Sequence, residues 1–148
     1  MNQTHWERRL RLGSGLILVA FVVLHLTNHA LGIFSFEAME ALRDWLAPVW
    51  RSTTGTILLY GAMALHFALA LYSLFRRTTL RMPTWEAAQL ILGLAIIPLI
   101  AFHATFNRLL WELTSYKVDY HLVIASIWYT DFETWRIILL VLVVWTHL

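Results

Sequence analysis

Three long stretches of the chain contain no Asp, Glu, Lys or Arg, and they constrain the fold more than any other feature. They cover residues 12–36, 52–75 and 87–107. Each is longer than the about 20 residues that a helix needs to cross a bilayer. A soluble domain carries about 25% charged residues, whereas this 148-residue chain carries 14% and is 59% hydrophobic. The sequence therefore predicts an all-α, polytopic transmembrane bundle.

The apolar stretches predict four antiparallel spans, which run up and down across the membrane within one anchor domain over residues 1–148. The expected spans cover residues 12–34, 55–75, 85–110 and 134–148. The fourth would rise about 22 Å, which is less than the about 30 Å thickness of the hydrocarbon core. We therefore expect the sequence to be the N-terminal part of a longer protein whose fourth helix continues.

The segments between the spans predict elements at the membrane surface. Residues 37–51 combine charged side chains with Trp45 and Trp50, which is typical of an amphipathic segment at the interface. The apolar piece 120–128 is expected to rest on the bilayer surface or against the bundle. Pro98 lies inside the third span and predicts a kink there.

Basic residues beside the spans predict the orientation and exclude one class of partner. Two short segments hold three arginines each, namely Arg8, Arg9 and Arg11, and Arg76, Arg77 and Arg81. Short cytoplasmic segments are enriched in Lys and Arg, so we place the N-terminus in the cytoplasm. These residues flank apolar spans and form no binding patch, so we expect no nucleic-acid partner. The chain has no Cys, which excludes a disulfide, an iron–sulfur cluster and a thiolate metal site.

Histidines are the most informative polar residues of the spans. An ionisable side chain inside a span is costly and indicates a functional site. The first span contains His25 and His29, and the others contain His66, His103 and His147 in turn. Small and polar residues follow these histidines at helical spacing, which leaves room for a large flat ligand or permits close helix packing. His5 and His121 lie outside the spans, and we expect them to be solvated.

The rise of the helices places these histidines at two depths. His25 and His103 fall about 10–13 Å inside the outer ends of their spans. His66 and His147 fall about 16–20 Å inside, in a deeper layer toward the cytoplasm. Alternate helices of an antiparallel four-helix bundle are diagonal across the core, so each layer predicts a His–His pair.

Two imidazoles that face each other across a bundle suit an iron porphyrin ligated on both sides. The pattern thus predicts two haem b groups with His25, His103, His66 and His147 as axial ligands. Zinc matches less well, because it takes three or four protein ligands. A single haem, a proton path and purely structural polar contacts remain alternatives.

Three more residues are candidates for contacts with the cofactor. His29 lies one turn outward of His25, and we expect it to donate to a haem propionate or a quinone, or otherwise to a carbonyl in a helix contact. Arg108, beside Asn107, is expected to pair with a propionate. The alternative role for Arg108 is to anchor the helix among lipid headgroups.

Several runs of residues resemble known families. RLGSGLILVAFVVLH at 11–25, HFALAL at 66–71, His103 after Gly93, and WTH at 145–147 resemble the ligand helices of the dihaem cytochrome b subunit of succinate dehydrogenase and fumarate reductase. The similarity to the membrane anchor of bacterial class III adenylate cyclases is closer and covers nearly the whole chain. It is carried by HLTNHALG at 25–32, RMPTWEAAQL at 81–90 and VWTH at 144–147.

The resemblance to the cyclase anchor implies a role in signalling. It implies a six-helix anchor in the bacterial inner membrane, followed in the same chain by a cytoplasmic adenylate cyclase domain, and we expect a homodimer. Residues 1–148 would then hold no catalytic group, and the lyase activity would belong to the domain that follows. The haem redox state, set by the quinone pool, would regulate that domain. The other resemblance implies an electron-transfer subunit of a quinone oxidoreductase, and a cofactor-free structural anchor is the third alternative.

Overall fold

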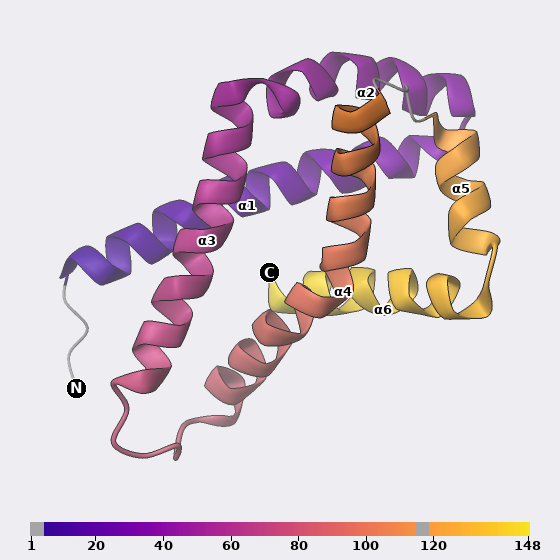
Figure 1. Ribbon diagram of the computed structural model, residues 1–148. Helices are drawn as coiled ribbons and strands as arrows, with labels where there is room; N and C mark the ends of the chain where they lie inside the picture. Colours follow the sequence, from indigo (N-terminus) through magenta and orange to yellow (C-terminus); the bar gives the residue numbers. More distant parts are fainter. Residues whose placement is uncertain (1–4, 115–118) are drawn as a thin grey trace. The chain divides into compact units, whose positions relative to one another are not determined.

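The computed structural model describes residues 5–114 and 119–148, and in this part of the chain it contains helices and no strand. Figure 1 shows these helices in chain order. They are α1 (His5–Ala30), the short 3-10 helix η1 (Leu31–Ile33), α2 (Phe36–Arg51), α3 (Thr53–Phe75), α4 (Thr84–Thr114), α5 (Tyr120–Trp128) and α6 (Asp131–His147). The predicted all-α class is therefore confirmed for the described residues.

Three helical segments are long and apolar enough to cross a membrane, which agrees with a polytopic membrane protein. They are His5–Ile33, Thr53–Phe75 and Thr84–Leu113, and they contain the first three predicted spans except for Phe34. Large apolar side chains on them remain exposed, for example Ile57 and Ile91, as expected for faces that meet lipid. The predicted fourth span falls on α6, which has 17 residues. Its crossing of the membrane, and the up-and-down order of the spans, stay predictions.

The helices extend beyond the predicted spans where polar residues can continue the helical turn. α1 begins at His5, seven residues before the expected start of the span, because arginine and glutamate are compatible with a helix that leaves the bilayer. The interfacial segment expected at 37–51 is the helix α2. The apolar piece at 120–128 is the helix α5 with the same bounds, and it contacts α6.

Side-chain caps fix where four of these helices begin. A hydroxyl or carboxylate oxygen just before each helix accepts a hydrogen bond from a free main-chain N–H of the first turn. The capping residues are Ser35 for α2, Ser52 for α3, Asp119 for α5 and Thr130 for α6. These polar residues divide a largely apolar chain into separate helices.

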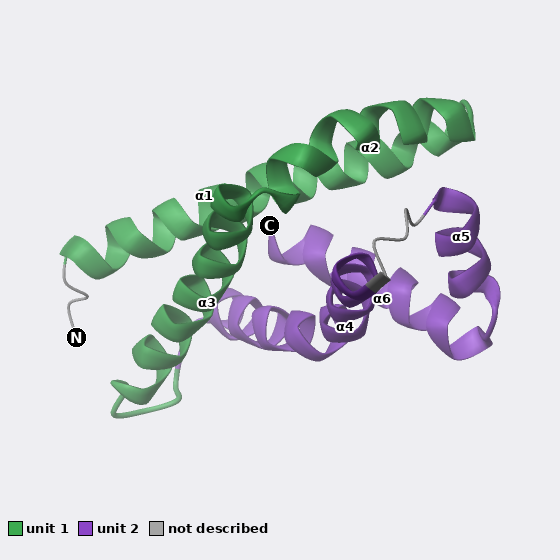
Figure 2. Ribbon diagram, turned by 45° about the horizontal axis from the view of Figure 1, so that its top comes forward, with its two compact units in different colours: residues 1–81 green, residues 82–148 purple. Residues whose placement is uncertain are grey.

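The chain forms two compact units, Met1–Arg81 and Met82–Leu148, which Figure 2 shows in green and purple. In the first unit α1 packs against α3, and α2 contacts both helices. In the second unit α4 packs against α6, and α5 also packs against α6. Each unit thus consists of a long helix, a shorter second helix and a third helix that returns to the first.

The helix α4 contains the predicted kink site. Pro98 lies inside α4, and Figure 1 shows the axis of α4 changing direction partway along its length. Proline has no N–H to donate and its ring crowds the preceding turn, so a helix bends where it contains one. The bend gives α4 the shape by which it contacts α6.

Candidate cofactor-binding site

In the first unit, the imidazole of His66 on α3 lies against Gly15 on α1. A Cβ atom built on Gly15 would lie 3.3 Å from Cε1 and 3.5 Å from Nδ1 of His66. The Nδ1 atom is also 3.3 Å from the hydroxyl oxygen of Ser14 and 3.3 Å from the main-chain oxygen of Arg11. The ring is therefore held on this side by small or main-chain groups of α1.

Ser14 is buried, with 4% of its surface exposed. Its hydroxyl donates to the carbonyl of Leu10, at 2.8 Å, and lies 3.1 Å from the carbonyl of Arg11. This back-bonding within α1 is the usual way in which a serine is accommodated inside an apolar helix. It leaves the oxygen of Ser14 facing the ring nitrogen of His66.

The other two histidines of the unit form a separate cluster farther along α1. The Nε2 atoms of His25 and His29 are 3.2 Å apart, and their rings meet edge to face. Phe21 stacks on His25 and meets Trp50 of α2 edge to face. Asn28, between the two histidines in sequence, is 3% exposed. These contacts bring His29 to His25 as a direct neighbour.

The two histidine positions of the first unit are separated along α1. His25 follows Gly15 by ten residues, which is about 15 Å along the helix axis. The group that includes His66 is therefore at one level of α1 and the cluster around His25 is at another. The depths of these histidines in a membrane stay predictions.

The second unit repeats the contact between a histidine and a glycine. The imidazole of His147 on α6 lies against Gly93 on α4, and a Cβ atom built on Gly93 would lie 2.9 Å from Cε1 of the ring. His103 follows Gly93 by ten residues on α4. Asn107 donates from its side chain to the main-chain oxygen of His103, at 2.7 Å. This unit also places its two histidines at two levels.

A cavity of about 410 Å³ adjoins His103 in the second unit. Such a volume is within the usual range for small-molecule sites. Most of its wall is apolar and comes from α4, α5 and α6, while a few polar groups converge on it. The polar lining residues are His103, Asn107, Ser126, Tyr129, Glu133 and Arg136.

Arg136 is the buried charge of this cavity, with 9% of its side chain exposed. It donates to the carboxylate of Glu133, at 2.6 and 3.0 Å, and to the main-chain oxygen of Leu99, at 2.5 Å. Its guanidinium also lies 5.4 Å from the centre of the Phe102 ring. α6 thereby places a fixed cation against the turn of α4 that precedes His103.

Arg108, the arginine expected to meet a propionate, has a different partner in the structure. It forms an ion pair with Glu112 at 2.6 Å, and its side chain is 29% exposed. It does not line the cavity, although its neighbour Asn107 does. Its role toward a cofactor stays a prediction, and Arg136 is the arginine that the structure places beside His103.

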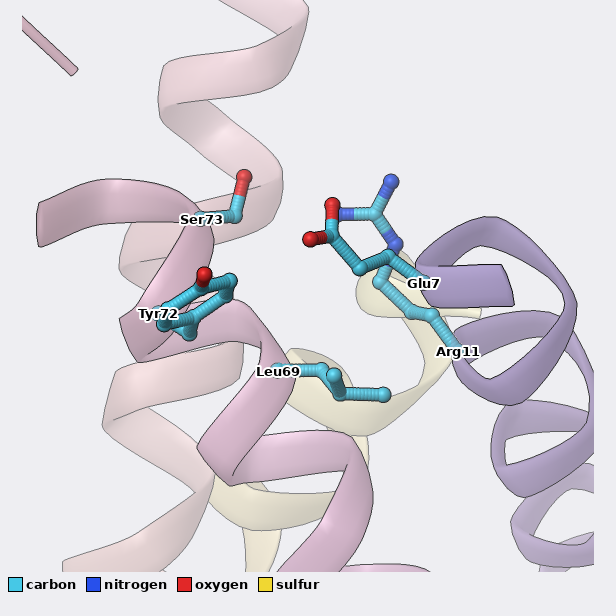
Figure 3. Close-up of a pocket in the computed structure, with 5 residues that line it drawn as sticks. All are labelled: Glu7, Arg11, Leu69, Tyr72 and Ser73. Carbon is cyan, nitrogen blue, oxygen red and sulfur yellow. The ribbon is translucent and has the colours of Figure 1, made fainter. Parts of the chain in front are cut away.

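The opposite end of the first unit has an ion pair between its two long helices. Arg76 at the end of α3 donates to Glu7 at the start of α1, at 2.8 Å, and lies over the ring of Tyr72. A cavity of about 10 Å³, the size of one water, lies beside them, and Figure 3 shows Glu7 and Arg11 pointing toward Tyr72 and Ser73 across it. This cavity is too small for a larger ligand.

The structure therefore brings some of the predicted site residues together and leaves others as a hypothesis. It joins His25 with His29, and His103 with Asn107. The predicted axial pairs, His25 with His103 and His66 with His147, each combine residues of both units, and they stay predictions.

Sequence reasoning missed three positions of the site. It gave Ser14 and Gly15 no role, and it did not single out Arg136. The spacing of ten residues that recurs in Gly15–His25 and Gly93–His103 is the signal that could have marked the two glycines. Arg136 gave a weaker signal, as an arginine that follows the cap of its helix by six residues.

The fold defines an all-helical protein with three helices able to cross a membrane. Comparison with family models, with curated proteins and with solved structures finds no match to this chain.

Proposed function

We propose that this chain is a haem b-binding membrane anchor in the bacterial inner membrane, with its N-terminus in the cytoplasm. The observation that carries the proposal is the placement of two histidines at two levels of each unit, with one of them set on a glycine of the first helix. Two haems would be held by His25 with His103 and by His66 with His147.

The residues fit the demands of a haem. The porphyrin supplies four nitrogen ligands, so the protein needs to provide two imidazoles for each iron. Glycine beside the ring of His66, and again beside that of His147, keeps side chains away from the imidazole. The surrounding helices are apolar, which suits a macrocycle that is largely hydrophobic. The donor set is thus of the right chemistry and number for two bis-histidine sites.

A bound haem b would supply a one-electron redox change. The chain's own part is to orient the imidazoles, to exclude water with apolar helices, and to place buried polar groups near the cofactor. The contacts of the His66 ring with Ser14 and Arg11 support such orientation. Outer contacts of this kind orient metal ligands and tune them.

The test is a reduced-minus-oxidised absorption spectrum of the purified chain reconstituted with haem b. We expect a b-type band, and we expect His66→Ala or His147→Ala to remove half of the bound haem, because each is predicted to bind the same iron. His121→Ala is the matched control, since this histidine lies on α5 outside the candidate spans. A chain without the band, or with the same haem content after both site substitutions, would refute the proposal.

We propose that the signal of the anchor passes to an adenylate cyclase domain in the same chain, in a homodimer. This part is supported by the resemblance of the residues around His25, Met82 and His147 to cyclase anchors. Full-length protein reconstituted in vesicles should change its cyclase rate when the bound haem is reduced. An unchanged rate at every ratio of oxidised to reduced quinone would remove the sensing role and leave haem binding intact.

The alternative is an electron-transfer subunit that acts on a quinone, and the cavity beside His103 favours it. The cavity combines aromatic walls with the buried donors of Arg136, which suits a flat ring bearing carbonyl oxygens. In this case the purified complex should contain flavoprotein and iron–sulfur subunits and should reduce a soluble quinone analogue. A protein that binds neither haem nor quinone would leave the structural anchor as the function.

A further inference from the structure

The two units of the chain show a partial correspondence in sequence, which includes residues of the site. Gly15 and His25 correspond to Gly93 and His103 at a shift of 78 positions, as the numbering shows. The third helices correspond at a shift of 81, which pairs His66 with His147. Each unit therefore contains a matching glycine and two matching histidines, in the same order on its first and third helices.

Two buried positions of each unit also match. At the shift of 81, Met39 on α2 corresponds to Tyr120 on α5, and both are buried at 3% and 5% exposure. Ala62 on α3 corresponds to Val143 on α6, and both are buried. These pairs come from different helices and do not involve the histidines. These two buried pairs and the matching site positions indicate a tandem repeat of one three-helix motif, although the buried Asn28 corresponds to the exposed Phe106.

The glycine contact is equivalent in the two units. In each unit, Cε1 is the imidazole atom closest to the place that a Cβ on the glycine would occupy. The distance is 3.3 Å for Gly15 and 2.9 Å for Gly93. Gly13 on α1 and Gly61 on α3 lack such a contact, because a Cβ on either would meet nothing within 4 Å among the described residues. A methyl group at either site glycine would therefore push the imidazole aside.

Hydrogen bonding fixes which nitrogen of His66 is available. The hydroxyl proton of Ser14 is used within α1, at 2.8 Å to Leu10, so its oxygen can only accept from His66. The carbonyl of Arg11 is also an acceptor, and both oxygens lie 3.3 Å from Nδ1. Nδ1 must then carry the proton, and Nε2 presents its lone pair.

We propose that Gly15 and Gly93 are equivalent positioning residues that hold the imidazoles of His66 and His147, and that Ser14 together with the carbonyl of Arg11 sets the tautomer of His66. Only the identity of the group that Nε2 would bind, a haem iron, rests on the proposed function. The repeat is imperfect: Leu92 stands where the first unit has Ser14, and Asn107 stands where it has His29. A serine therefore contributes to the tautomer in the first unit alone.

The first experiment measures the ring nitrogens without any cofactor. In the chain labelled with ¹⁵N-histidine in detergent micelles, His66 is assigned by the loss of its signals in His66→Ala. We expect a protonated Nδ1 and an unprotonated Nε2 in the wild type, and a shifted Nδ1 signal in Ser14→Ala, which keeps the carbonyl of Arg11 but loses one of the two acceptors, that Ser14→Thr reverses. A protonated Nε2 in the wild type, or an unchanged signal in Ser14→Ala, would overturn the role of Ser14.

The second experiment titrates the glycine variants with haem b. We expect Gly93→Ala to weaken haem binding by about 10- to 100-fold, as other disturbances around metal ligands do, and Gly15→Ala to weaken it less because its contact is looser. Gly13→Ala and Gly61→Ala are the matched controls and should bind as the wild type does, with unchanged helical circular dichroism. Equal affinity in all four variants would overturn the role of the glycines.

The two experiments separate the positioning role from the proposed function. If the wild type binds no haem, the proposed function fails. The ¹⁵N spectra then still decide the positioning role, because Gly15→Ala must shift the ring signals of His66 while Gly13→Ala must leave them in place. Unshifted signals in Gly15→Ala would overturn it.

Discussion

Removing the carboxylate of Glu133 is the substitution that tests the energetics of the second unit most directly. Glu133→Ala leaves Arg136 without the partner that accepts two of its hydrogen bonds, at 2.6 and 3.0 Å. The guanidinium is 9% exposed, so water replaces the lost partner poorly. Its remaining bond to the carbonyl of Leu99, at 2.5 Å, cannot neutralise the charge.

The magnitude follows from this burial. Breaking a buried ion pair by removing one partner costs about 3–5 kcal/mol, because a charge remains in a poorly solvated place. Glu133 itself is 22% exposed, so some water reaches the pair, and we expect about 3 kcal/mol. The second unit offers a matched control, since Arg108 and Glu112 form an ion pair of the same length, 2.6 Å, with 29% and 53% exposure. Glu112→Ala should cost at most about 1 kcal/mol.

The assay is reversible unfolding in mixed micelles, where the free energy of unfolding is compared among four proteins. These are the wild type, Glu133→Ala, Arg136→Met and the double variant. We expect the double variant to be more stable than Glu133→Ala, because it removes the unpaired charge. Equal losses for Glu133→Ala and Glu112→Ala, or a double variant less stable than either single one, would refute the argument from burial.

Two further predictions concern the junction between α2 and α3. Gly55→Ala should destabilise the fold by about 1–3 kcal/mol, because its Cβ would overlap the carbonyl oxygen of Val49. Gly61→Ala, in open space on the same helix, is the control and should be neutral or slightly stabilising. Equal unfolding free energies for the two variants would contradict this prediction. Ser52→Ala should cost about 1 kcal/mol through loss of the cap on α3, whose oxygen accepts from the N–H of Gly55 at 3.0 Å. Ser126→Ala removes an exposed hydroxyl that donates to the carbonyl of Val123, so a thermal melt that shifts as much for it as for Ser52→Ala would argue against the cap.

Local features of the chain were sufficient to predict the helices. Uncharged stretches located three helices that can cross a membrane, and the bounds of α5 follow from the polar cap Asp119 before it and the polar cap Thr130 after it. The start of α1 at His5 was not predicted, because charged residues end an apolar stretch without ending a helix.

The site was predictable in its residue types and less so in its contacts. The histidines of the spans can be recognised from the sequence, because an ionisable side chain inside a span is costly and indicates a functional site. The contact of His66 with Ser14 joins positions 52 residues apart, and no local spacing contains that information. The contact of Arg136 with Leu99, 37 residues away, was missed for the same reason. The recurrence of Gly15–His25 as Gly93–His103 was available in the sequence and would have indicated the repeat.

The junction at Ser52 has a mechanical consequence for the first unit. One residue ends α2 and starts α3: its N–H donates to Pro48, its hydroxyl donates to Val49 at 2.7 Å, and its oxygen caps α3. Because the N–H, the hydroxyl proton and the hydroxyl oxygen of this single connecting residue all form hydrogen bonds, its backbone torsions are closely restricted. A rotation of α2 would therefore be transmitted to α3 and would displace His66.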